Sequence, residues 1–156
     1  MRKTLIQESL PEATTEPGQW LDLETLASVE VTSESPGYPV ESVFAGGADA
    51  GWRAAEAGKQ VIRLVFDQPH DIHRIQLRFS ETGVERTQEF VLEWAPPGGP
   101  MREIVRQQWN FNPSGATAEI EDYHVDLNGV SVLQLTINPD ITHSQVPASL
   151  SQWRVA

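Results

Sequence analysis

Residues 60–79 read QVIRLVFDQPHDIHRIQLRF, and this stretch decides the fold class. Large apolar side chains recur at every second position on both sides of a polar centre, which is the two-residue period of half-buried strands. The centre, 67–71, holds a proline without an N–H group and two aspartates that can bond their own backbone, so we expect the chain to reverse there. The stretch predicts a β-hairpin with one face in a core. The expected core residues are Ile62, Leu64, Phe66, Ile75, Leu77 and Phe79.

The same period recurs along the chain between turn signals. The pair Asn128-Gly129 predicts a second hairpin, because both central positions of a type I′ turn need a positive φ. The segment Trp20 to Leu26 fits either a helical turn or an irregular strand. We predict an all-β, antiparallel, jelly-roll-like sandwich of about eight strands. Besides the first hairpin, the strands are expected at 27–33, 90–94, 103–111, 117–127, 130–137 and 150–155.

Length, composition and charge limit the function classes. At 156 residues the chain is one ordinary domain, for which we predict a lead-in over 1–25 and a sandwich over 26–156. There is no cysteine, which excludes disulfides and thiolate chemistry. The formal net charge of −11, without a dense basic run, disfavours nucleic acid and anionic membranes as partners. No signal-like or membrane-length apolar run is visible, so we expect a cytoplasmic protein.

Two groups of titratable residues were weighed as chemistry. His70 and His73 lie near aspartates, but their spacing and the lack of a third histidine at a metal-site spacing favour ordinary turn residues. Glu119 and Glu121 share one strand face and offer the carboxylate pair of a glycosidase, although a solvated edge is the expected explanation. No nucleophile elbow, phosphate loop or His-Glu-x-x-His motif is present. The sequence predicts no enzymatic activity and no metal site.

The long connection 34–59 is rich in glycine and proline and contains aromatic anchors, which is typical of an ordered functional loop. Its glycine-rich loop is closed by Trp52, and the strand that begins Gln60-Val61-Ile62 follows. With the later segments 90–94 (FVLEW) and 149–154 (SLSQWR), this order of elements resembles the discoidin, or coagulation factor type C, domain. That family is a galactose-binding-domain-like jelly roll that also occurs as bacterial carbohydrate-binding modules.

The resemblance implies a non-catalytic module. It also allows a prediction about whether a structural calcium ion is bound. Many members hold a structural calcium with acids in the loop before the tryptophan and in the last strand. Here Ala45-Gly46 and Gln152 stand at those places, so we expect no cofactor, with a backbone-bound structural calcium possible but not favoured.

The resemblance further implies that loops at one end of the sandwich hold a ligand. Arginine forks, carboxylates and an aromatic face suit a sugar, so carbohydrate binding is the predicted function. The alternative is a cytoplasmic protein-interaction or assembly domain, favoured by polar strand faces. Trp52, Trp109 and Asn110, at or near predicted strand ends, are further candidates, with a structural role favoured for the tryptophans. The predicted ligand-binding residues are Tyr38, Asp49, Arg53, Glu81, Arg86 and His143.

Overall fold

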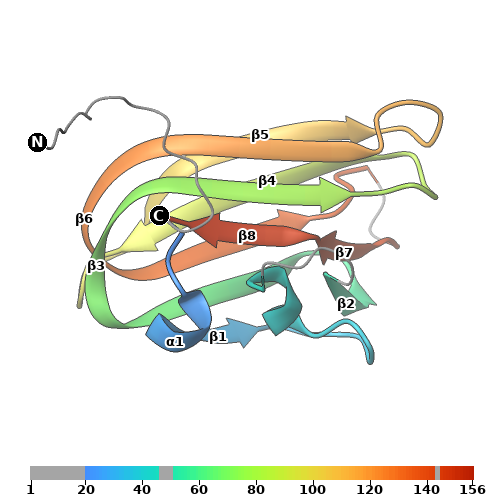
Figure 1. Cartoon of the computed structure of the whole chain (residues 1–156). Helices are drawn as coiled ribbons and strands as arrows, with labels where there is room; N and C mark the ends of the chain where they lie inside the picture. The colour runs from blue at the N-terminus through green and yellow to red at the C-terminus, as the bar shows by residue number, and fades with distance from the viewer. Residues whose placement is uncertain (1–19, 46–50, 143–144) are drawn as a thin grey trace, which may run out of the picture.

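The computed structural model describes residues 20–45, 51–142 and 145–156. In this part of the chain eight strands form an antiparallel sandwich, with one helical turn and one 3-10 helix beside it (Figure 1). None of its helices is long and apolar enough to cross a membrane. In chain order the elements are α1 Leu23–Leu26, β1 Ala27–Val31, η2 Val40–Val43, β2 Trp52–Ala57, β3 Gln60–Ser80, β4 Arg86–Ala95, β5 Arg102–Phe111, β6 Ala118–Asn138, β7 Pro147–Leu150 and β8 Gln152–Val155.

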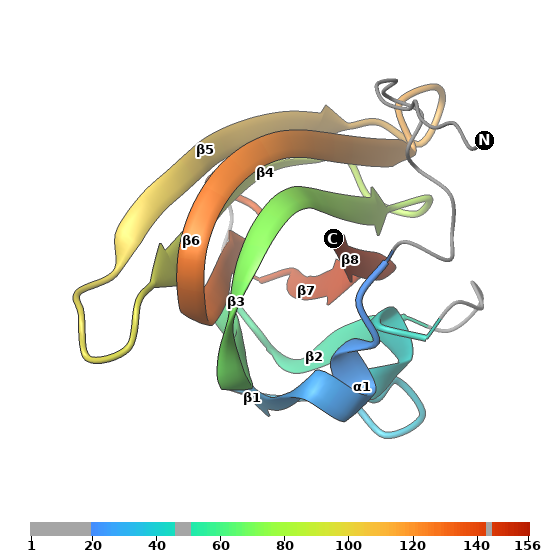
Figure 2. The same ribbon diagram turned by 60° about the vertical axis from the view of Figure 1, so that its left-hand side comes forward.

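Two long strands, β3 and β6, run through both faces of the sandwich. Figure 2 shows how both curve from one face to the other. The large sheet contains β1, the first half of β3, the second half of β6, β4 and β5. The small sheet contains β8, the second half of β3 and the first half of β6. The strands β2 and β7 form a separate pair.

The two predicted hairpins do not exist, because each forms one continuous bent strand. β3 pairs with β6 on both sides of the expected turns, from Gln60↔Ile137 to Ser80↔Ala118. Between Val65↔Val132 and His70↔Val130, residues 66–69 of β3 stand opposite residue 131 alone, so the turn-like residues form a bulge. Opposite, Gly129 has a φ of 69° and donates its N–H to Asp71 Oδ1 at 2.9 Å.

Proline and positive-φ glycine suit a bulged corner as well as a reversal, since both interrupt a regular ladder. The sequence therefore predicted correctly where the regular strand pairing is interrupted, but the prediction that the chain reverses at these places was wrong. His70 and His73 consequently lie within a strand rather than in a turn.

The predicted alternation into the core is confirmed. All six expected core residues of β3 are buried, and Leu133, Leu135 and Ile137 of β6 face them from the neighbouring strand. Tyr123, Val125 and Leu127, also expected inside, are half-buried against this core. Burial of these apolar surfaces is the main stabilising contribution to a disulfide-free domain of this size.

Three other expectations need correction or completion. The connection 34–59, predicted as an ordered loop, contains η2 and all of β2. The last strand is divided at Ser151 into β7 and β8. The open alternative at Trp20 to Leu26 resolves as the single helical turn α1. The domain division at residue 26 stays a prediction, since residues 1–19 lie outside the described part.

Candidate ligand site at the loop end

Four connections meet at one end of the sandwich, which we call the loop end: 32–39, 81–85, 112–117 and 139–142. In Figure 1 they lie opposite the bends of β3 and β6. They come together because β3 starts and finishes at this end, so the chain enters and leaves both sheets there. Backbone bonds join them to each other and to strands, as Glu81 N donates to Thr117 O at 2.9 Å and Ile141 N to Thr87 O at 2.8 Å.

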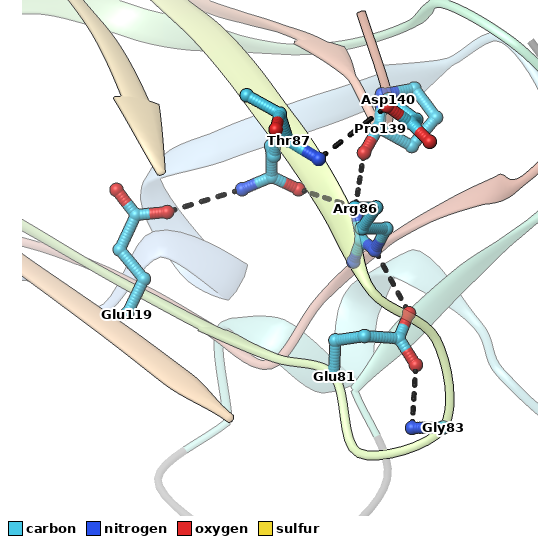
Figure 3. Close-up of polar contacts among 8 residues, drawn as sticks. Glu81, Gly83, Arg86, Thr87, Glu119, Pro139 and Asp140 are labelled. Atoms are coloured by element: carbon cyan, nitrogen blue, oxygen red, sulfur yellow. Dashed lines mark hydrogen bonds and ion pairs between the residues drawn. The ribbon is translucent and has the colours of Figure 1, made fainter. Parts of the chain in front are cut away.

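Arg86 is the centre of the polar contacts at the loop end (Figure 3). It is 2% exposed. Its Nε donates to Glu81 Oε1 at 2.9 Å, and its Nη1 donates to Gln88 Oε1 at 3.0 Å and to the Pro139 carbonyl at 2.7 Å. Its guanidinium lies 4.7 Å from the centroid of the Phe111 ring. One buried side chain thus joins the connections 81–85 and 139–142.

Two carboxylates complete this attachment. Glu81 Oε2 accepts from the Gly83 N–H at 3.0 Å, which holds its own loop in a turn. Asp140 Oδ1 accepts from Thr142 N at 3.0 Å and Thr142 Oγ1 at 2.7 Å, and more weakly from Thr87 N at 3.4 Å. Burial lowers the pKa of Arg86 from its usual value, and the hydrogen bond and charge of Glu81 partly offset that effect. The loop end is therefore ordered by charge-assisted hydrogen bonds.

Glu119 lies beneath this network and is 1% exposed, so the expectation of a solvated edge is wrong for it. Its Oε1 accepts from Gln88 Nε2 at 3.3 Å. Burial, then the hydrogen bond and negative charge of Glu121, raise the pKa of Glu119 to about 9. Glu119 is consequently a neutral acid at pH 7. The predicted proximity of Glu119 and Glu121 is confirmed, since the hydrogen bond and charge of Glu121 act on Glu119.

A hollow of about 510 Å³ opens beside Arg86. Its polar side chains come from the start of β4, the end of β5 and the connections next to them. Sequence reasoning named Asn110 as a candidate but missed Thr87, Asn112 and Thr142, because small polar residues in loops carry no signal until their loops are brought together. The lining residues are Glu85, Arg86, Thr87, Asn110, Phe111, Asn112 and Thr142.

Of the six predicted ligand-binding residues, the structure describes four. Tyr38 is an exposed ring, and the guanidinium of Arg53 lies 5.1 Å from its centroid. Glu81 and Arg86 form the buried pair described above. Asp49 and His143 lie outside the described residues. Tyr38 and Arg53 are not among the residues that line the hollow beside Arg86, and the ligand-binding role of all six residues remains a prediction.

The other aromatic and histidine candidates have structural surroundings. Trp52 is 1% exposed and donates its Nε1–H to the Ser33 carbonyl at 2.9 Å. Trp109 packs half-buried against the core. The His70 ring packs on Phe66, with centroids 5.4 Å apart. In the residues that the structure describes, no group of three or more His, Cys, Asp or Glu side chains could hold a metal ion.

The residues at the two places where the family resemblance implies acids do not fit a calcium ion. Ala45 brings no side-chain oxygen. The side-chain oxygen of Gln152 accepts from Arg154 Nη2 at 3.0 Å and Nε at 3.2 Å. Arg78 stands opposite Gln152 on β3. The Arg154 guanidinium already bonds the one side-chain oxygen there, which disfavours a divalent cation, because calcium prefers several carboxylate and carbonyl ligands.

Comparison with known proteins agrees with this architecture. No protein family model matches the sequence, and no curated protein matches it. Solved structures do match, among them the module CBM32-3 of a family 31 glycoside hydrolase from Clostridium perfringens, at 19% identity and a TM-score of 0.65 over 87% of this chain and 93% of that one. The chain has the fold of the family 32 carbohydrate-binding modules. This is the discoidin-like jelly roll that the sequence predicted.

Two further family 32 modules were solved with sugars. The module of NanJ from C. perfringens, in complex with galactose, is 13% identical with a TM-score of 0.61, and the match covers 87% of this chain and 96% of that one. The module of AlyQ, in complex with 4,5-unsaturated mannuronic acid, is 15% identical with a TM-score of 0.61, and the match covers 84% and 95%. At these identities the similarity establishes the fold of this chain and leaves its ligand to be argued from its own residues.

Proposed function

We propose that this protein is a non-catalytic module that binds a carbohydrate at its loop end. The polar hollow of about 510 Å³, with walls from connections that Arg86 and Asp140 hold in place, carries the proposal. Its volume is within the range of roughly 300–1,000 Å³ of small-ligand sites. Its hydroxyl, amide and carboxylate groups offer the donors and acceptors that sugar hydroxyls need. Because the side chains of this wall are already held in place, less conformational entropy is lost when a ligand binds.

Tyr38 and Arg53 supply the apolar side of the site. A tyrosine ring offers a flat face to the C–H groups of a sugar ring. The guanidinium over the Tyr38 ring restrains both side chains and presents a hydrogen-bonding fork next to that face. The buried Arg86 acts differently, since its Nε and Nη1 donate to Glu81, Gln88 and the Pro139 carbonyl. We assign Arg86 the role of positioning the loops rather than contacting the sugar.

The carboxylate pair does not support hydrolysis. Glu119 is 1% exposed and already bonded to Gln88, so a glycosidic oxygen has no route to its proton. Glycosidases need both carboxyl groups to reach the scissile bond. The proposal is therefore of binding alone.

The experiment is a glycan array, followed by calorimetry of any hit with Asn110→Ala and Tyr38→Ala. Asn110 lines the hollow, and its side chain is bonded to Thr87 Oγ1 at 2.7 Å. The matched control is Gln108→Ala, two residues away on the same exposed face of β5 and bonded to Glu89. We expect each site variant to weaken binding about tenfold and the control to leave it unchanged.

Two outcomes would overturn the proposal. If no glycan binds, the protein-interaction alternative becomes the better hypothesis, because the same fold and loops can recognise a protein. If a glycan binds and all three variants bind it equally well, the sugar is held elsewhere on the molecule. Release of reducing sugar from a bound glycan would contradict the non-catalytic part.

A further inference from the structure

A second hollow lies on a different surface, the outer face of the small sheet. It has a volume of about 330 Å³ and is lined by Arg78, Ser80, Ser151 and Gln152. Arg78 and Ser80 are exposed on β3, where they alternate with the buried Phe79. Ser151 joins the two last strands and donates its backbone N–H to the Arg78 carbonyl at 2.8 Å. No carboxylate lines this hollow.

Arg78 is an uncompensated cation there. Within the described part of the chain, its guanidinium has no hydrogen-bond or ion-pair partner, whereas the nearby acid on the same face is already occupied. That acid is Asp122, which binds Arg74 through both oxygens and also accepts from Gln76 at 3.3 Å. A free arginine fork beside hydroxyl groups, in a chain of net charge −11, is a local site for an anion.

Gln152 adds a donor, and Ile120 adds an apolar wall. Because the side-chain oxygen of Gln152 accepts from Arg154, its amide N–H groups point the other way as donors. Arg154 also adds a second positive charge on the same strand. On the other side of Arg78, its partner in β6 is Ile120, which is 53% exposed. The surface thus presents a cation, hydroxyl and amide donors, and one apolar patch side by side.

We propose that this hollow is a second binding site, for the carboxylate of an acidic sugar of the uronate class. Arg78 grips the carboxylate as a two-pronged donor, while the hydroxyls of Ser80 and Ser151 and the amide of Gln152 bond to ring hydroxyls. Ile120 covers the apolar side of the ring. A sugar fits better than an acidic peptide, because one carboxylate flanked by hydroxyls matches one arginine flanked by hydroxyls and an amide. The site is separate from the loop end and does not depend on it.

The test is calorimetry with trigalacturonic acid and with its methyl ester, which keeps the rings and removes the charge. We expect the acid to bind, with an affinity that falls as salt rises, and the ester to bind at least tenfold more weakly. Arg78→Ala should weaken binding of the acid by tenfold to a hundredfold. Arg78→Lys keeps the charge without the fork and should recover only part of the loss.

The matched control is Arg63→Ala, which removes the same charge from β3 on the outer face of the large sheet. It should leave binding unchanged, as should Tyr38→Ala at the loop end. The proposal is overturned if the acid does not bind at millimolar concentration, if the ester binds equally well, or if Arg78→Ala and Arg63→Ala behave alike. Equal competition by polyglutamate would assign the surface to an acidic protein and would also overturn it.

Discussion

The two ends of the sandwich are closed in different ways. At the bend end, where β3 and β6 pass from one sheet to the other, the backbone of the two strands forms the closure through a bulge and the pair His70↔Val130. At the loop end separate connections meet, and the side chains of Arg86, Glu81 and Asp140 hold them together. A closure made by backbone tolerates most side-chain changes. A closure made by buried charged side chains does not, because removing one partner leaves the others unsatisfied.

The largest expected effect is that of Arg86→Ala. The substitution leaves Glu81, Gln88 and the Pro139 carbonyl without their donor, so we expect the free energy of unfolding to fall by about 3 kcal/mol. Urea denaturation measures it. Arg63→Ala, which breaks an exposed pair with Glu30, should cost below about 1 kcal/mol. Equal losses in the two variants would mean that the loop end does not depend on Arg86.

The second effect is a pH dependence from Glu119. Its pKa is raised from 4.5 to about 9 in the folded state, so between these values the folded protein holds a proton that the unfolded chain has released. Rising pH therefore favours unfolding, with a slope of at most about 1.4 kcal/mol per pH unit. Glu119→Gln is neutral at every pH and lacks this contribution.

The measurement is urea denaturation of wild type and Glu119→Gln from pH 5 to pH 8. The variant should gain stability relative to wild type as the pH rises. Glu103→Gln, at an exposed site on β5, should follow the wild type throughout. If the Glu119→Gln curve also runs parallel to the wild type, the buried carboxyl does not carry the proton.

A smaller effect tests the bend end. Gly129 has a φ of 69°, and a Cβ placed there would meet nothing within 4 Å. Gly129→Ala should therefore cost about 1 kcal/mol through backbone strain alone. Gly115 has equal space and no positive φ, so Gly115→Ala should be neutral or slightly stabilising in the same denaturation experiment. A loss well above that of Arg86→Ala would reverse the comparison between the two ends.

The smallest expected effect is that of calcium. If side chains rather than an ion hold the loop end, the melting temperature in millimolar calcium should equal that in chelator. The bonds from Arg154 to the side-chain oxygen of Gln152 are the physical reason for this expectation. A gain of about 2.7 kcal/mol, the linkage value for calcium at 100 times its dissociation constant, would show that backbone oxygens suffice for a site.

The sequence predicted part of the loop end, but the contacts between its side chains could not be predicted from the sequence. Of the predicted ligand-binding residues, Glu81 and Arg86 form an ion pair at the loop end, and Arg53 lies over the Tyr38 ring. That Arg86 is buried as a connector, with Glu119 protonated beneath it, could not be predicted. Burial and pairing at this site depend on which loops meet, and Arg86 and Pro139 are 53 residues apart in the chain.

The sequence by itself determined three things: the alternation of apolar and polar side chains, which residues of β3 and β6 face the core, and the all-β fold class. The alternation of side chains between the two faces of a strand is a local property. Apolar residues at every second position therefore lie on one face, and that face is the one that is buried. Only the tertiary structure decided that Asp67 to Asp71 and Asn128-Gly129 are corners of two paired strands rather than two reversals. A proline without an N–H and a glycine with positive φ interrupt the ladder either way, and the long-range pairing of β3 with β6 selects the bend.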